Sequence, residues 1–342
     1  MHPDSIAETG RVPHGGEPDR SLLDFSANIN PQIPDGVETV YADALERARR
    51  YPDDTYPVFR EAAAEYVGCT PDAVIATPGG LAAIRLSLEC TLEAGDTALV
   101  PYPSFGEYAR EVRLQGATPA FVPHDDLYDL EVPHLEQADL AVCCTPNNPT
   151  GDCPSNERLE AFARRCGDAG TTLLVDEAFL GFTDRPSMAS SGFEHVVVAR
   201  SLTKLFGLPG LRAGFAVATG DLGERLAVAR RAWSLGTPEA AVGAHCMRDR
   251  AFVRETRARV DSERERVRTA LLEDGRYDVY DSVAPYLLFE STEPVDDLLE
   301  RARDAGVVLR DCRTFQGLER HVRVAVAERE TNDRLLEVLC DA

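Results

Sequence analysis

The chain has 342 residues, 44% of them hydrophobic, and a formal net charge of −22. That length is long for one core and suits two domains that share a cleft. Because acidic residues are spread along the whole chain, nucleic acids and anionic membranes are excluded as partners by charge repulsion. An acidic surface almost without lysine also suits a protein adapted to strong salt, with an ordinary acidic enzyme as the alternative.

The nine cysteines include no Cys-x-x-Cys pair, only the adjacent Cys143 and Cys144. An odd number of cysteines without metal spacing indicates reduced thiols in a cytoplasm and no metal site. No apolar run approaches the ~20 residues that span a bilayer. The sequence therefore predicts a soluble cytoplasmic protein without a membrane partner.

The first 35 residues read as an extended arm with one short strand, and helices are expected over 36–50 and 58–67. Strands and helices then alternate from residue 70 to residue 220. We expect strands at 73–77, 97–100, 118–122, 140–144, 172–175, 196–199 and 211–217, with helices at 81–91, 106–115 and 157–169. This alternation predicts an α/β fold with a mostly parallel sheet, whose ligands lie beyond the carboxyl ends of the strands.

The remainder of the chain reads as helical and then as α+β. Helices are expected at 221–231, 239–247, 251–273, 295–305 and 332–339, and strands at 277–280, 285–290, 307–310 and 321–326. We expect three parts: an N-terminal arm over 1–35 that packs near the small domain, a large domain over 36–249, and a smaller C-terminal domain over 250–342.

One residue stands out by its side chain. Lys204 is the only lysine among the 36 Lys and Arg residues. Arginine carries charge as well as lysine does, but it cannot lose a proton near neutral pH and so cannot form a Schiff base with an aldehyde. The lone lysine therefore indicates a nucleophile for a carbonyl group, with a chance surface residue as the alternative.

Polar residues that follow two other strands fit a pyridoxal cofactor. Asp176 ends the strand Leu173–Val175, where a carboxylate can keep a pyridine nitrogen protonated; a helix cap or a metal ligand is the alternative. Asn147 lies in the turn after the expected strand over 140–144. Its amide could reach the ring oxygen or a substrate carboxylate. Pro, Asn and Gly also make ordinary turns, so this signal is weak alone.

A second group of residues predicts a phosphate site. Gly80 and Leu81 stand between a strand and a helix N-terminus, where free N–H groups and the helix dipole favour an anion. Hydroxyls and a guanidinium could join them from Ser201, Thr203 and Arg212. Phe105 could lie flat on the cofactor ring, or could be an ordinary core residue.

Two arginines near strand ends suggest a substrate with two anionic groups. Arg323 interrupts a run of valines, and the functional interpretation is a bidentate clamp on a substrate carboxylate. A solvent-facing arginine on an edge strand is the alternative. Arg310 follows Val307–Leu309 and could supply the second anion site.

Taken together, these residues resemble the fold-type I pyridoxal-phosphate enzymes, the aminotransferases of class I and II, in the branch of histidinol-phosphate aminotransferase. The resemblance covers nearly the whole chain. It is carried by Tyr51–Asp53, Pro146–Gly151, Asp176–Ala178, Ser201–Lys204, Gly210–Arg212 and Arg323. Within the branch, His14–Gly16, Asp24–Pro31 and Leu309–Leu318 resemble the threonine-phosphate decarboxylases of cobalamin biosynthesis.

The resemblance implies the aspartate aminotransferase-like fold, bound pyridoxal 5'-phosphate and a phosphorylated amino-acid substrate. It implies that Lys204 binds the cofactor aldehyde, Asp176 the pyridine nitrogen and Asn147 the ring oxygen. It places the cofactor phosphate on Gly80, Leu81, Ser201, Thr203 and Arg212. It also implies a homodimer, in which Tyr51 reaches the phosphate of the neighbouring subunit. The substrate residues it implies are Arg323, Arg310, Asn147, His14 and Asn28.

The function implied is decarboxylation of L-threonine O-3-phosphate to aminopropanol phosphate, with histidinol-phosphate aminotransferase as the alternative. Phe179 stands where the aminotransferases usually have a tyrosine, which fits the decarboxylase better. The turn Thr77–Ala82 lacks the usual asparagine and hydroxyl, so backbone amides must do more of the phosphate binding. A catalytically silent pyridoxal-binding regulator is disfavoured, because residues 1–35 cannot form a DNA-binding domain and the net charge opposes DNA contact.

Overall fold

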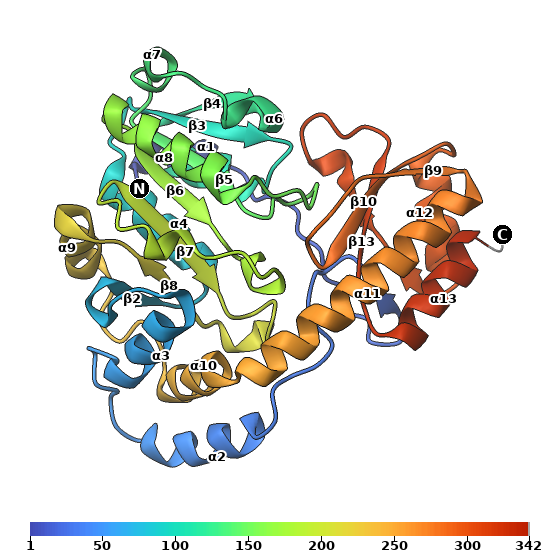
Figure 1. Ribbon diagram of the computed structural model, residues 1–342, viewed down its shortest axis with the longest axis horizontal. Helices are drawn as coiled ribbons and strands as arrows, with labels where there is room; N and C mark the ends of the chain where they lie inside the picture. Colours follow the sequence, from blue (N-terminus) through green and yellow to red (C-terminus); the bar gives the residue numbers. More distant parts are fainter. Residues whose placement is uncertain (341–342) are drawn as a thin grey trace.

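Two separate sheets organise the chain in the computed structural model, which describes residues 1–340. Figure 1 shows them as two bodies joined by the long helix α11 (Arg250–Asp274). We call the body built on the seven-stranded sheet the large domain and the body built on the four-stranded sheet the small domain.

The large sheet has the strand order β2-β8-β7-β6-β5-β3-β4. Its strands are β2 (Val74–Thr77), β3 (Thr97–Tyr102), β4 (Thr118–Pro123), β5 (Leu140–Cys144), β6 (Thr172–Asp176), β7 (Val196–Ser201) and β8 (Gly214–Val217). Neighbouring strands are parallel except at β8, which is antiparallel to both β2 and β7. The predicted mostly parallel sheet is thus confirmed.

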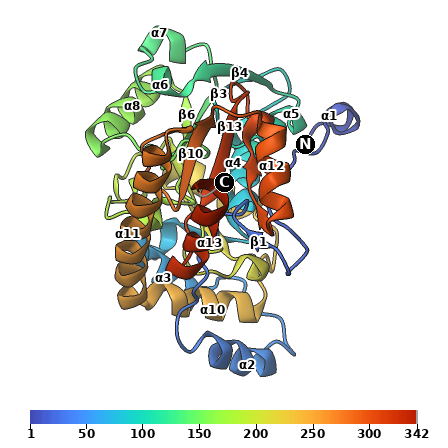
Figure 2. The same cartoon turned by 90° about the vertical axis from the view of Figure 1, so that its right-hand side faces the viewer.

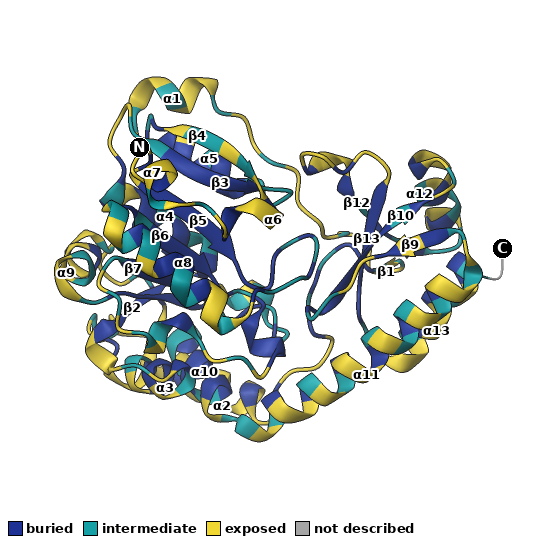
Figure 3. Ribbon diagram, turned by 45° about the horizontal axis from the view of Figure 1, so that its top comes forward, coloured by how far each residue is buried: buried dark blue, intermediate teal, exposed yellow. Residues whose placement is uncertain are grey.

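Helices cover both faces of this sheet, because successive residues of a strand point to opposite sides. Leu173 and Val175 of β6 join the core on one face, and Leu174 joins the core on the other. The first core is covered by α3 (Pro57–Val67), α8 (Asn156–Ala169) and α10 (Thr237–Arg248), and the second by α4 (Gly80–Thr91), α5 (Glu107–Leu114) and α9 (Gly220–Ala229). Figure 3 shows the buried strands between these helical layers.

The small domain is an antiparallel sheet of order β12-β13-β10-β9. Its strands are β9 (Tyr277–Val279), β10 (Tyr286–Ser291), β12 (Arg310–Asp311) and β13 (His321–Ala325), and its own helices are α12 (Val295–Asp304) and α13 (Arg329–Cys340). Figure 2 looks onto this domain and shows α13 in front of the strands, with α11 and α12 to either side.

The N-terminal arm adds to the small domain. Strand β1 (Leu23–Asp24) pairs in parallel with β11 (Val307–Val308), and Phe25 is buried in the small-domain core. The single strand expected over 307–310 is therefore two strands in two sheets, since β11 pairs with the arm and β12 pairs with β13. The arm also contains a short helix, α1 (Pro3–Glu8), which the sequence did not predict.

Helix α11 belongs to both cores. Its first half buries Val253 and Val260 in a core of the large domain, and its second half buries Val267 and Leu271 in the small-domain core. The expected boundary at residue 250 coincides with the start of this helix. Because α11 is shared, it forms a stiff connection between the two domains.

Other differences from the predicted elements are local. The helix expected over 36–50 is the shorter α2 (Val37–Arg47). Two single-turn helices, α6 (His124–Leu127) and α7 (Val132–Leu135), were not predicted. The strand expected from Leu211 begins only at Gly214, because Arg212 has a left-handed backbone with φ 53°. Within residues 1–340, no helix is long and apolar enough to cross a membrane.

Candidate active site

A cavity of about 310 Å³ lies at the carboxyl ends of β6 and β7, where the domains and the arm meet. Twelve of the predicted site residues line it: His14, Asn28, Gly80, Leu81, Phe105, Asp176, Ser201, Thr203, Lys204, Arg212, Arg310 and Arg323. Two do not, Asn147 and Tyr51. The cavity thus collects residues that are more than 300 positions apart in the chain.

Lys204 follows β7 and is largely buried in this cavity. Burial, and then the positive charges of Arg323 and Arg212, lower the pKa of Lys204 to about 8, while Asp176 acts in the opposite direction. Removing water disfavours the charged amine, and nearby cations disfavour it further. The amine is therefore much more often neutral, and so more nucleophilic, than an ordinary lysine at neutral pH.

This pKa predicts how fast the cofactor-free protein combines with pyridoxal 5'-phosphate. The neutral amine is the reactive form, so the rate should rise with pH and reach half its maximum near pH 8. The rate would be followed by stopped-flow absorbance between about pH 7 and 10, beside a free lysine derivative as the control. A midpoint near the ordinary lysine pKa of about 10.4 would contradict the burial of this amine.

Asp176 lies at the end of β6, only 5% exposed, on the face toward α4 and α5. Its Oδ1 accepts a hydrogen bond from the Ala178 N–H at 3.0 Å, and its Oδ2 accepts one from the Tyr108 hydroxyl at 2.5 Å. Burial raises the pKa of Asp176, and these two donors oppose the rise. Both donors are neutral, so no cation is bonded to the carboxylate of Asp176. The carboxylate can therefore pair with a protonated ring nitrogen.

The phosphate turn stands where α4 begins. Gly79 has φ 90°, and a Cβ built there would lie 2.6 Å from the Arg212 guanidinium. A Cβ at Gly214 would lie 2.6 Å from both the Arg200 carbonyl oxygen and the backbone of Gly79. Glycine is needed at Gly79 because of its positive φ, and at Gly214 because neighbouring backbone approaches so closely. Since the helix N-terminus of α4 offers free N–H groups, the result is an anion cradle.

Two hydroxyls and one guanidinium complete this cradle. The hydroxyls of Ser201, the last residue of β7, and of Thr203 lie 2.8 Å apart. Arg212 also lines the cavity, and its Nη1 donates to the Pro209 carbonyl at 3.3 Å. The turn without the usual asparagine thus has other groups for a phosphate, and the residues present fit pyridoxal phosphate.

The amide in the cavity belongs to Asn148 and not, as predicted, to Asn147. The side chain of Asn147 is fully buried behind the loop, where its Nδ2 donates to the Pro103 carbonyl at 3.1 Å and to the Thr150 hydroxyl at 2.9 Å. Asn148 lines the cavity, and its Oδ1 accepts a hydrogen bond from Arg323. The prediction chose the wrong member of the pair because two adjacent asparagines in a turn point in opposite directions.

Arg323 is 5% exposed and sits on β13 between β12 and β10, so the solvent-facing alternative is wrong. Its Nη2 donates to the Ser26 carbonyl at 3.1 Å, and its guanidinium lies 5.0 Å from the centroid of the Tyr286 ring. With its amide oriented so that Oδ1 faces the guanidinium, Asn28 also accepts from Arg323 at 3.2 Å. Two residues of the arm, Ser26 and Asn28, thus hold the guanidinium of Arg323 in place.

The remaining substrate candidates come from the arm and the small domain. Arg310 donates to the Pro13 carbonyl and to the Thr314 hydroxyl, both at 3.0 Å. His14 Nε2 lies 2.9 Å from Glu107 Oε1, and its ring centroid is 5.7 Å from that of Phe105. The arm therefore covers the cavity and is fixed to both domains.

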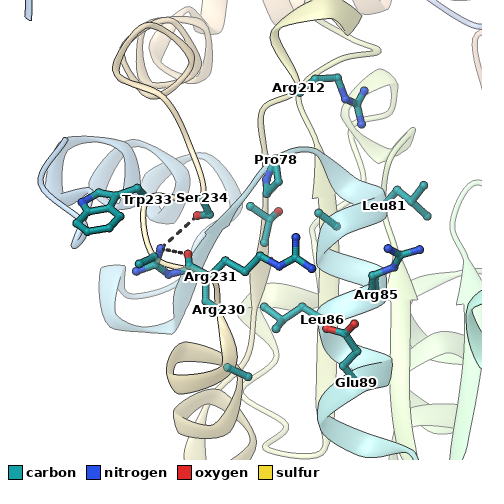
Figure 4. A pocket seen from close by; sticks show the side chains of 14 residues that line it. Pro78, Leu81, Arg85, Leu86, Glu89, Arg212, Arg230, Arg231, Trp233 and Ser234 are labelled. Carbon is teal, nitrogen blue, oxygen red and sulfur yellow. Dashed lines mark hydrogen bonds between the residues drawn. The ribbon is translucent and has the colours of Figure 1, made fainter. Parts of the chain in front are cut away.

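Tyr51 is 80% exposed and does not reach the cavity of its own chain. Its ring is stacked on Trp233 with the centroids 4.6 Å apart. Trp233 lines a second cavity, of about 510 Å³, on the other side of the phosphate turn, and Arg212 lines both cavities. Figure 4 shows this cavity between α4, with Arg85 and Glu89, and the segment of Arg230 and Ser234.

The sequence reasoning missed Tyr108 and Asn148. Tyr108 is the second residue of α5 and comes three residues after Phe105, which precedes the helix. The rings pack edge to face with their centroids 5.5 Å apart. That spacing was the available signal for Tyr108. Within residues 1–340, no group of three or more His, Cys, Asp or Glu side chains is placed to hold a metal ion.

The fold, the buried lysine, the strand-end carboxylate and the anion cradle define a pyridoxal-phosphate-dependent enzyme. Comparison with known proteins agrees. The family model for aminotransferase class I and II matches residues 20–339, and the chain belongs to that family. The prediction of the family, and of pyridoxal phosphate as its cofactor, is thereby confirmed.

Individual relatives carry two different names. The chain is 32% identical to threonine-phosphate decarboxylase of Salmonella typhimurium, over 99% of this chain and 95% of the relative. It is 29% identical to histidinol-phosphate aminotransferase 2 of Archaeoglobus fulgidus, over 94% and 93%. The structure of histidinol-phosphate aminotransferase from Sinorhizobium meliloti in complex with pyridoxal-5'-phosphate has the same fold, with a TM-score of 0.83, 20% identity and coverage of 92% and 89%.

Proposed function

We propose that the chain decarboxylates L-threonine O-3-phosphate and releases carbon dioxide and aminopropanol phosphate. The observation that carries the proposal is the charge of the cavity. Its lining includes the cations Lys204, Arg212, Arg310 and Arg323 but only the carboxylate of Asp176. This excess of positive charge occurs in a chain whose net charge is −22. The hydrogen bonds of the three guanidinium groups go to neutral oxygens, which leaves their charge for ligands.

Each guanidinium has an anion to match. Arg212 stands in the cradle for the cofactor phosphate, Arg323 would bind the substrate carboxylate, and Arg310 would bind the substrate phosphate. Arginine suits the last two tasks because its planar fork forms paired hydrogen bonds with carboxylate and phosphate oxygens. A substrate with one carboxylate and one phosphate uses both.

When bound, pyridoxal phosphate supplies an electron sink for a bond broken at the substrate Cα. The residues of the chain decide which bond that is. Arg323 would hold the carboxylate so that the bond from Cα to the carboxylate carbon breaks and carbon dioxide leaves. The buried amine of Lys204 would then deliver a proton to Cα. If Cα–H were aligned instead, the same amine would remove that proton, and transamination would follow.

The position of Phe179 favours decarboxylation. Its ring lines the cavity and packs edge to face on Tyr286, with the centroids 5.1 Å apart, so no hydroxyl is offered there. The alternative is the histidinol-phosphate aminotransferase reaction. Two observations support this alternative. Histidinol phosphate also carries a phosphate, and relatives of about 30% identity bear both names.

Two incubations separate these functions. With L-threonine O-3-phosphate we expect carbon dioxide and aminopropanol phosphate in equal amounts, without added 2-oxoglutarate. With histidinol phosphate and 2-oxoglutarate we expect little glutamate. Glutamate formation in the second mixture together with no carbon dioxide in the first would replace the decarboxylase by the aminotransferase.

We further propose that the enzyme is a homodimer in which Tyr51 of the partner subunit reaches the cofactor phosphate. The exposed Tyr51 and Trp233 pair supports this proposal, as does the second cavity, which gives access to Arg212 from outside the chain. Tyr51→Ala should then weaken cofactor binding although the residue lies outside its own cavity. A monomer in sedimentation at the enzyme concentration of a full activity assay would contradict the dimer.

A further inference from the structure

We propose that Tyr108 is a positioning residue for the cofactor's pyridine nitrogen: its hydroxyl holds Asp176 as an oriented carboxylate anion that faces the ring. This inference rests on the proposed pyridoxal-phosphate chemistry, with Asp176 at the ring nitrogen as the family resemblance implies, and does not depend on which substrate is used. It assigns a function to a fully buried tyrosine that neither the cofactor nor the substrate contacts require.

The geometry is a short hydrogen bond between two buried side chains. Tyr108 is 0% and Asp176 is 5% exposed, and the hydroxyl donates to Oδ2 at 2.5 Å. The Ala178 N–H donates to the other oxygen, Oδ1, at 3.0 Å. A carboxylate oxygen can accept two hydrogen bonds, so both oxygens keep a position for the ring N–H. The two donors therefore fix the plane of the carboxylate and leave its cavity side open.

Toward Asp176 the hydroxyl of Tyr108 acts as the donor. Burial, and then the negative charge of Asp176, raise the pKa of Tyr108 well above its ordinary value, so the hydroxyl keeps its proton. It stabilises the buried anion without neutralising it, unlike an arginine or lysine partner. Since no positive charge is consumed, the ring nitrogen can remain the cation of the pair.

The backbone explains how one helix places two parts of the cofactor site. Phe105 lies just before α5 and Tyr108 is the second residue of that helix, and the Tyr108 N–H donates to the Phe105 carbonyl at 3.1 Å. Phe105 and Tyr108 both line the cavity, and the Tyr108 hydroxyl donates to Asp176. A shift of α5 would therefore change the ring contact and the carboxylate together.

The test is Tyr108→Phe, with Tyr128→Phe as the matched control. Tyr128 is also buried, at 2% exposed, and packs edge to face on Phe162, but its hydroxyl has no hydrogen-bond partner in the described chain. Each variant is loaded with ¹⁵N-labelled pyridoxal phosphate, and the chemical shift of the ring nitrogen is measured. In Tyr108→Phe the shift should move toward the unprotonated value, and in Tyr128→Phe it should stay at the wild-type value.

A second measurement separates this effect from a general loss of packing. The affinity of the cofactor-free variant is compared for pyridoxal phosphate and for the analogue with C–H in place of the ring nitrogen. Tyr108→Phe should reduce the preference for pyridoxal phosphate roughly 10- to 100-fold, the range for a hydrogen bond to a charged group. A purely structural defect would weaken both ligands equally, and that outcome overturns the inference.

Asp176→Asn distinguishes failure of this inference from failure of the proposed site. If Asp176→Asn moves the nitrogen shift and Tyr108→Phe does not, Tyr108 has no positioning role and Asp176 keeps its own. If neither variant moves the shift, the role proposed for Asp176 is itself wrong.

Discussion

Replacing Lys204 by arginine is expected to abolish the visible absorbance of lysine-linked pyridoxal and to lower turnover by roughly 10²–10⁴-fold or more. The substitution keeps a positive charge in the cavity but removes the lysine amine, whose pKa of about 8 lets it become neutral. Cofactor phosphate binding through Arg212 and the turn of α4 should survive. The measurement is the absorption spectrum of the reconstituted variant, followed by the decarboxylase assay.

The control for this exchange is the reverse substitution on the surface. Arg254 is exposed on α11, and Arg254→Lys adds an amine where no cofactor aldehyde comes near. That variant should keep the wild-type spectrum and turnover. If Lys204→Arg also kept both, the amine would have no part in the chemistry and the assignment of the site would be lost.

The sequence was sufficient to predict which strand-end residues meet in the cavity. Lys204 was singled out because arginine cannot form a Schiff base, and Asp176 because a carboxylate follows an apolar strand, and both line the cavity. The phosphate turn was found from two glycines before a helix. Gly79, with φ 90°, and Gly214, packed against Arg200 and Gly79, show why side chains are excluded there. Such local constraints can be read from a sequence, since they act over a few residues.

The sequence was insufficient where side-chain direction decides. Asn147 and Asn148 occupy one turn, and only tertiary packing places Asn148 beside Arg323. The bond from Tyr108 to Asp176 joins residues 68 positions apart, so no local pattern could predict it. The same holds for the strand expected over 307–310, which divides because the arm supplies β1 as a partner for β11 alone.

Arg323→Ala should lower kcat/KM for L-threonine O-3-phosphate, because it removes one partner of a desolvated charge pair. The expected loss of transition-state stabilisation is about 2–5 kcal/mol. This corresponds to a loss of roughly 30-fold to several thousand-fold. Arg323→Lys should recover only part of it, because the ammonium cannot reproduce the planar fork. In both variants the carboxylate is less well aligned, so release of carbon dioxide should fall relative to side reactions at Cα–H. Product analysis beside the kinetics measures both effects.

The matched control is Arg320→Ala, three residues earlier on the same segment. The Arg320 side chain is 57% exposed, lies 3.3 Å from Glu290 and is outside the cavity. Surface ion pairs of this kind contribute about 0–1 kcal/mol, so its kinetics should stay near wild type. Thermal unfolding of all three variants detects damage to folding, since Arg323 also contacts the Tyr286 ring and the Ser26 carbonyl. Arg323→Lys could fold normally and match Arg320→Ala in kcat/KM and in product ratio. The substrate carboxylate would then have to bind elsewhere, and Arg310 is a remaining guanidinium candidate in the cavity.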